Sequence, residues 1–166
     1  MLEHAGFSLQ TVEGRSIVRL RVQPHQADHV VEHLSPAWGA CRFAPDQWLL
    51  FSDDMSASGM IEQLGTSLND QLHAAHDLSS ALCCMELSGP AARTVLAMGC
   101  GIDFHPRAFP EGCGVRTRIA QVAAIIVAGT RERFWLFHDR SFSRYLARWC
   151  IEAGSDPLTL EIAEKN

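Results

Sequence analysis

The chain has 166 residues, of which 47% are hydrophobic and 20% charged, a composition that indicates one folded domain and excludes a disordered or membrane-embedded protein. The 14 basic and 19 acidic residues give a formal charge of -5, which disfavours binding to nucleic acid or anionic lipid. The N-terminus shows no basic region followed by an apolar stretch, so we expect a cytoplasmic protein whose six cysteines are free thiols.

The first half of the chain predicts strands and helices in alternation. Strands are expected at Phe7–Val12 and at Ser16–Val22, where apolar residues alternate with arginines. A helix is expected from Pro24 onward, because Ala27, Val30, Val31 and Leu34 form one apolar stripe at helical spacing. A strand at Trp48–Phe51 and a second helix follow, the helix marked by Met60, Ile61, Leu64 and Leu68.

The second half repeats this order. Strands are expected at Leu72–Leu78 and Ala81–Leu87, then a helix at Pro90–Met98 capped by Ser88 or Gly89. Three further strands are expected at Val115–Gln121, Val122–Ala128 and Arg133–His138, the middle one central because it is apolar throughout. A last helix, capped by Ser141, carries one apolar face formed by Phe142, Tyr145, Leu146, Trp149, Cys150 and Ala153.

The two passes predict a single domain, residues 1–166, built from pseudo-repeat halves at about 1–69 and 70–155. A repeated β-α-β-β-α unit defines the α+β class, with antiparallel sheets and helices on one face. A common order of strands and helices could arise by chance about as often as by duplication.

Histidines and cysteines offer candidate sites, but each has a simpler interpretation. His25, His29 and His33 are spaced four apart, a metal-binding spacing on a helix, yet that face is polar and supplies no further ligand. His73 and His76 would point to opposite faces of a strand, which separates them as an acid-base pair with Asp77. Cys113 is expected in an exposed loop, where His105 or Arg116 could activate it, but no catalytic signature surrounds it.

We therefore assign no catalytic, cofactor-binding or metal-ligating residue to this chain. The residues that remain suggest contact with another protein. The loop Cys100–Gly114 is long for a compact domain, and such loops are commonly functional. The last helix presents a basic stripe that could dock on a carboxylate-bearing partner, although such stripes are usually only solvated. The predicted interface residues are Phe104, His105, Arg107, Phe109, Arg140, Arg144 and Arg148.

Three segments also carry a family resemblance. Leu87-Ser-Gly-Pro-Ala-Ala-Arg93, Gly99-Cys-Gly-Ile-Asp103 with the following Phe104–Pro110, and Arg140-Ser-Phe-Ser-Arg-Tyr-Leu146 together resemble the gamma subunit of heterotetrameric sarcosine oxidase. That family is similar in fold to the folate-binding domain of the glycine-cleavage T-protein. Ala147 stands where the family often has an aromatic residue, which leaves open a related complex acting on another N-methyl or secondary amine.

The resemblance implies a noncatalytic structural subunit of a flavoenzyme complex that oxidatively demethylates sarcosine and passes the one-carbon unit to tetrahydrofolate. It places FAD, FMN, NAD and tetrahydrofolate in the alpha and beta subunits and zinc in a delta subunit. The alternative is a stand-alone folate- or pterin-binding module of the T-protein type. A free-standing hydrolase or metalloenzyme is the least favoured hypothesis, because the sequence shows no complete catalytic or metal site.

Overall fold

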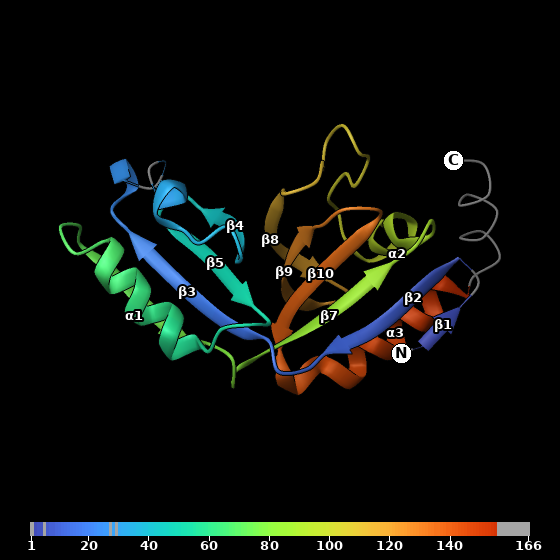
Figure 1. Ribbon diagram of the computed structural model, residues 1–166. Helices are drawn as coiled ribbons and strands as arrows, with labels where there is room; N and C mark the ends of the chain where they lie inside the picture. The colour runs from blue at the N-terminus through green and yellow to red at the C-terminus, as the bar shows by residue number, and fades with distance from the viewer. Residues whose placement is uncertain (1, 5, 27, 29, 156–166) are drawn as a thin grey trace. The chain divides into compact units, whose positions relative to one another are not determined.

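The structure is a computed structural model that describes residues 2–4, 6–26, 28 and 30–155 (Figure 1). The chain forms two compact units, one made of Gly14–Leu82 and the other of the described residues on both sides of that segment. Both units combine a sheet with helices, and the strand pairings are antiparallel in each. The predicted α+β class with antiparallel sheets is confirmed.

The described residues of the unit 14–82 form one four-stranded sheet and one α-helix. The sheet order is β4-β5-β3-β6. Its elements are β3 (Ser16–Val22), β4 (Gly39–Ala44), β5 (Gln47–Ser52), α1 (Ala57–Ser67) and β6 (His73–Asp77). The Ser56 side chain caps α1 by accepting a hydrogen bond from the Gly59 amide at 3.2 Å. Met60, Leu64 and Leu68 of the helical segment are fully buried and pack with the apolar side chains of β3 and β5.

The helix predicted from Pro24 is wrong. The segment instead forms two short 3₁₀ helices, η1 (Pro24–Gln26) and η2 (Val30–His33). Histidine and β-branched valine are weak helix formers, and Pro36 ends the segment before a longer helix could be established. Val30 is buried in the core and Leu34 packs against it, while Ala27 and the side chain of Val31 lie outside the described residues. Strand β4 was not predicted, because its small and polar residues give little apolar alternation.

The second unit contains a six-stranded sheet in the order β1-β2-β7-β10-β9-β8. Its strands are β1 (Leu2–His4), β2 (Phe7–Val12), β7 (Leu82–Ser88), β8 (Gly114–Ile119), β9 (Val122–Ala128) and β10 (Arg133–Asp139). Its helices are α2 (Ala92–Gly99), η3 (Arg140–Phe142) and α3 (Ser143–Gly154). As predicted, the wholly apolar β9 is an interior strand.

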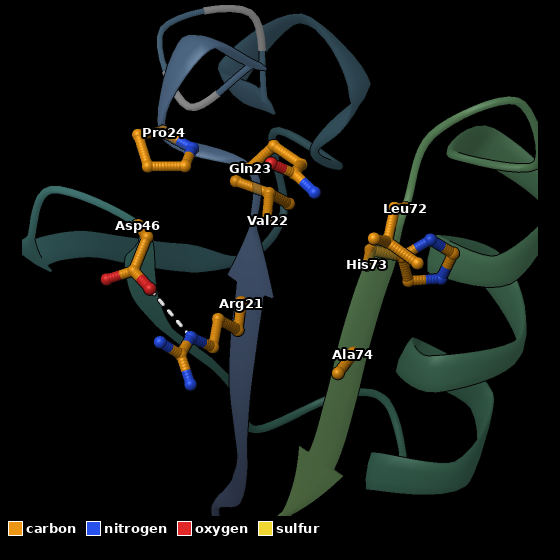
Figure 2. Close-up of a pocket in the computed structure, with 8 residues that line it drawn as sticks. All are labelled: Arg21, Val22, Gln23, Pro24, Asp46, Leu72, His73 and Ala74. Carbon is orange, nitrogen blue, oxygen red and sulfur yellow. Dashed lines mark hydrogen bonds and ion pairs between the residues drawn. The ribbon is translucent and has the colours of Figure 1, made fainter.

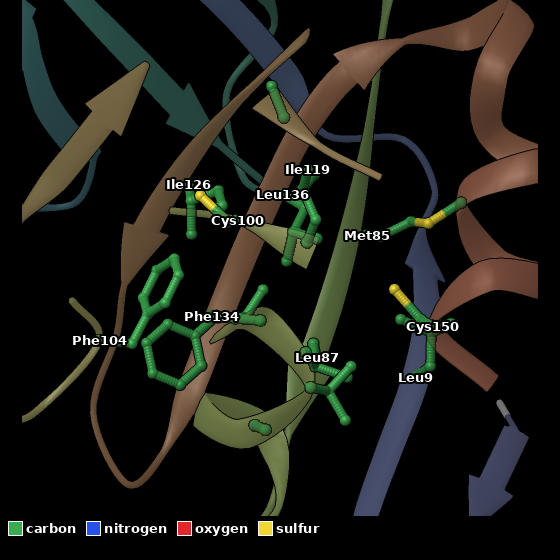
Figure 3. Close-up of a cluster of buried hydrophobic side chains, with 14 of the residues drawn as sticks. Leu9, Met85, Leu87, Cys100, Phe104, Ile119, Ile126, Phe134, Leu136 and Cys150 are labelled. Carbon is green, nitrogen blue, oxygen red and sulfur yellow. The ribbon is translucent and has the colours of Figure 1, made fainter. Parts of the chain in front are cut away.

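The core of this unit lies between the sheet and the helices α2 and α3. Figure 3 shows strand residues such as Leu9, Leu87 and Leu136 grouped with Cys150 of α3. Gly154, the last residue of α3, lies against Phe7, since a Cβ atom built there would be 2.0 Å from the Phe7 ring. The first long strand and the last helix therefore belong to one core.

The two units do not coincide with the two sequence halves. Strand β2, from the first half, pairs with β7, whereas β6, from the second half, pairs with β3. The opening strand of each half thus completes the sheet of the other. With this exchange, the order β4-β5-β3-β6 corresponds strand for strand to β9-β10-β7-β2. The compact units are therefore bounded at 13/14 and 82/83, whereas the pseudo-repeat halves, about 1–69 and 70–155, and their duplication stay predictions.

Candidate partner-binding surface

The motif between Leu87 and Arg93 forms the junction of β7 and α2. Gly89 has φ +111°, and a Cβ atom there would lie 2.7 Å from the Gly6 carbonyl oxygen. Helix α2 starts two residues after Pro90, and its N-cap makes no side-chain hydrogen bond, so the predicted cap by Ser88 or Gly89 is wrong. The backbone of Ala91 instead donates to the Gly6 carbonyl at 2.9 Å. Within this motif, Gly89 and Ala91 therefore make close backbone contacts with Gly6, and we assign the motif no catalytic role.

Arg93, at the end of this motif, anchors the loop that follows α2. Its Nη1 donates to the carbonyl oxygens of Phe104 and of Phe109, the latter at 3.1 Å. Its Nε donates to Glu132 Oε2 at 2.6 Å, and the guanidinium lies 4.9 Å from the centre of the Phe134 ring. The largely buried Arg93 side chain thus holds the loop at two points, Phe104 and Phe109. It also contacts Glu132 and the Phe134 ring.

The two phenylalanines of the loop lie in the core, which corrects the expectation that they face a partner. Phe104 is 3% exposed and Phe109 is 5% exposed. Their rings meet edge to face at 5.3 Å, and both pack on Phe134, which Figure 3 shows beside Phe104. Their burial was not predicted, because aromatic residues in a loop are expected to be exposed unless the core residues that they contact are known.

The other two predicted loop residues are exposed. The His105 amide donates to Asp103 Oδ1 at 2.8 Å, and the Arg107 amide donates to His105 Nδ1 at 3.2 Å. These contacts hold the backbone in consecutive turns, so His105 and Arg107 lie outward on a fixed frame. Whether they contact a partner stays a prediction.

The turn η3 and helix α3 combine exposed arginines with exposed aromatic rings. Arg140, Arg144 and Arg148 are all exposed, and Arg148 Nε donates to Glu152 Oε1 at 2.7 Å. The Glu152 carboxylate raises the pKa of Arg148.

The single apolar face predicted for this helix is wrong in part. Leu146, Cys150 and Ala153 are buried, but Phe142 is 48% exposed and Tyr145 is 49% exposed. The cause is local. Residues Arg140–Phe142 form the separate turn η3, capped by Asp139 and not by Ser141, so Phe142 leaves the register of the α-helix.

The unit of residues 14–82 has a groove of about 280 Å³ at one end of β3 and β6 (Figure 2). The lining residues are Arg21, Val22, Gln23, Pro24, Asp46, Leu72, His73 and Ala74. Arg21 Nε donates to Asp46 Oδ2 at 2.6 Å, and this pairing lowers the pKa of Asp46. Asp46 therefore forms an ion pair with Arg21. Figure 2 shows His73 on the neighbouring strand β6, away from that pair.

The remaining candidates do not assemble into a site in the described residues. His25 is exposed on η1, while His29 and the side chain of His33 lie outside the described residues. His73 and His76 lie three apart on β6 and so point to opposite faces, as predicted.

The six cysteines are free thiols, as predicted, but Cys113 is half-buried and its backbone is bonded to the end of β9. Burial raises the pKa of Cys150 to about 12, which keeps that thiol protonated. In the described ranges no group of three or more histidine, cysteine or acidic residues is arranged to hold a metal ion, and no helix there is long and apolar enough to cross a membrane.

His138, near the end of β10, is a buried titratable group that sequence reasoning did not single out. Its side chain is 1% exposed and, by strand alternation, lies on the same face as Phe134 and Leu136. Nδ1 is 2.9 Å from the Asp139 carbonyl oxygen, and Nε2 has no hydrogen-bond partner within the part of the chain that the structure describes. Burial lowers the pKa of His138, a shift only partly opposed by Asp139.

We predict that the free energy of unfolding falls as the pH is lowered from about 7 to about 5. An unfolded histidine takes up its proton near pH 6.5, whereas the buried His138 resists it, so acid favours the unfolded chain by at most about 1.4 kcal/mol per pH unit. Denaturant titrations at several pH values would show a flatter profile for His138→Asn. The exposed His76→Asn is the control and should keep the wild-type slope. An unchanged slope in His138→Asn would contradict the prediction.

Comparisons with known proteins agree with the fold and with the sequence motifs. A solved chain of the heterotetrameric sarcosine oxidase from Corynebacterium sp. U-96, in complex with pyrrole 2-carboxylate, aligns with a TM-score of 0.78 at 21% identity, covering 93% of this chain and 86% of that one. The glycine cleavage system aminomethyltransferase T from Bartonella henselae aligns with a TM-score of 0.64 at 15% identity, covering 94% of this chain and 49% of that one. The fold is therefore that of the aminomethyltransferase and sarcosine oxidase proteins.

The family follows from sequence comparison. The model of the sarcosine oxidase gamma subunit family matches residues 34–156. The gamma subunit of Corynebacterium sp. (strain P-1) is 30% identical over 112 residues, which cover 68% of this chain and 54% of that protein. The gamma subunit of an Arthrobacter species is 33% identical over 110 residues, covering 66% and 53%. The chain belongs to the sarcosine oxidase gamma subunit family and spans about half the length of the curated relatives it matches.

Proposed function

We propose that this protein is a noncatalytic structural subunit of a sarcosine oxidase-type flavoenzyme complex. The match of the gamma subunit family model to residues 34–156 is the observation that carries the proposal. A solved structure with the same fold is described as a heterotetrameric sarcosine oxidase, which supports a role within an assembly. In the proposed complex, alpha and beta subunits hold FAD, FMN, NAD and tetrahydrofolate, and a delta subunit holds zinc.

Such a subunit would act by holding its partners through exposed surface. The loop presents His105 and Arg107 on a frame fixed by Arg93, and α3 presents arginines beside exposed aromatic rings. A fixed frame favours association, because little conformational entropy is lost when the partner binds. A stable interface needs about 800 Å² from each partner, so the loop and α3 would have to be joined by neighbouring surface.

The test is recovery of the complex from the native source. A tagged full chain should co-purify with larger subunits that absorb light as flavoproteins and that oxidise sarcosine. Other N-methyl and secondary amines assayed on the same material would define the substrate. A monodisperse chain that recovers no flavoprotein would contradict the proposal.

The alternative is a stand-alone folate- or pterin-binding module, and its support is the fold shared with aminomethyltransferase T. Titration of the purified chain with tetrahydrofolate separates the two proposals. Binding with a Kd of about 1 μM would favour the alternative, since a structural subunit has no need of the ligand.

A further inference from the structure

The positive charge on α3 stands out in an acidic protein. The whole chain carries 14 basic and 19 acidic residues, yet the turn η3 and the exposed side of α3 carry three arginines against two acidic residues, Asp139 at the N-cap of η3 and Glu152, which pairs with Arg148. Arg144 forms no ion pair among the described residues, and the first turn of α3 contains no acidic residue. The local charge is therefore opposite in sign to the charge of the chain.

Folding of the helix does not account for this arrangement. Arg144 lies in the first turn of α3, where the helix dipole disfavours a positive charge. Arg144 and Arg148 are four residues apart, a spacing at which like charges repel. The Arg148–Glu152 pair offsets part of this cost, but Arg144 has no such pair within the described part of the chain, so Arg144 is better explained by a contact outside the chain.

Exposed aromatic rings accompany the charges. Phe142 and Tyr145 flank Arg144 in sequence and are each about half exposed, although both could have been core residues by spacing. Arginine and tyrosine are, with tryptophan, the side chains most enriched among residues that dominate binding energy at protein interfaces. The outer face of α3, defined as Arg140, Phe142, Arg144, Tyr145 and Arg148, thus combines cations with apolar contact area.

We infer that the outer face of α3 docks an acidic surface of a partner subunit, with Arg144 bonded to a partner carboxylate and the two aromatic rings packed around it. The inference rests on the proposed function, because the partner is a subunit of that complex. Charge complementarity selects the occupant, since a carboxylate-bearing surface neutralises the unpaired arginine and a second copy of this face would repel it.

The experiment compares full-length variants in the recovery assay from native extract. Arg144→Glu should recover at least about tenfold less flavoprotein than wild type, and Tyr145→Ala should also recover less. Arg116→Glu, an identical charge reversal at an exposed position of β8, is the matched control and should recover wild-type amounts. Recovery by wild type should fall in about 1 M salt, where the screening length is only about 3 Å. Circular dichroism of each variant checks that α3 remains folded.

The outcomes separate this inference from the proposed function. If wild type and Arg144→Glu recover equal amounts of flavoprotein, or if Arg116→Glu loses as much, the inference is overturned and the proposed function stands. If wild type recovers no flavoprotein, the proposed function fails and the inference fails with it. Self-association of wild type that Arg144→Glu abolishes would identify a second copy as the occupant and would also overturn the inference.

Discussion

We expect Gly89→Ala to lower the free energy of unfolding by about 4 kcal/mol, the largest effect of any single methyl group that we predict for this chain. Two independent costs add. An alanine at φ +111° is strained by about 1–3 kcal/mol. Its Cβ atom would also lie 2.7 Å from the Gly6 carbonyl oxygen and 3.0 Å from Phe7 Cα, and backbone atoms cannot move aside as a side-chain tip can.

Thermal and denaturant unfolding of the full chain would measure this effect, with an expected decrease in Tm of roughly 10 °C. Gly101→Ala is the matched control, because a Cβ atom there has no neighbour within 4 Å. Its effect should remain within about 0.5 kcal/mol. Equal stability of the two variants would show that Gly89 is not in close contact with the β1–β2 turn.

Local pattern was sufficient for most elements. Strand β3 alternates apolar and arginine residues and begins and ends where predicted, and β9 is apolar throughout and is interior. Helix α1 follows from the spacing of Met60, Ile61 and Leu64, whereas its cap by Ser56 was not predicted. In each case neighbouring residues along the chain contain the information, because burial on one face imposes a period of two or of 3.6 residues.

Features that depend on distant residues could not be predicted in this way. The exchange of β2 and β6 between the two sheets leaves their alternation unchanged, so no local signal distinguishes it from pairing within each half. The burial of Phe104 and Phe109 depends on Phe134, which lies in a later strand. The same limit applies to the surface of α3, where the predicted arginines are exposed but the exposure of Phe142 follows from the separate turn η3.

Arg93 shows the limit most clearly, because its partners are 11, 16 and 39 residues away in sequence. We predict that Arg93→Met lowers the free energy of unfolding by about 3 kcal/mol. The carbonyl groups of Phe104 and Phe109 lose a charged donor, Glu132 loses its partner, and the methionine supplies none of these bonds. Arg93→Lys should restore little, because a lysine ammonium is a single compact centre that cannot reach acceptors bound by two separate guanidinium nitrogens, and it has no planar face to stack on the Phe134 ring.

Hydrogen exchange distinguishes a loop anchor from a general core residue. In Arg93→Met the amides of residues 101–113 should exchange at least about tenfold faster, whereas those of β9 should change only with global stability. Arg107→Met, on the exposed side of the same loop, should leave both unchanged. If the loop amides in Arg93→Met remain as protected as in wild type, Arg93 does not hold the loop. If the loop amides do exchange faster, His105 and Arg107 are no longer held in fixed positions. Weaker recovery of the partner by Arg93→Met, with α3 still folded, would then show that the loop contributes to the interface.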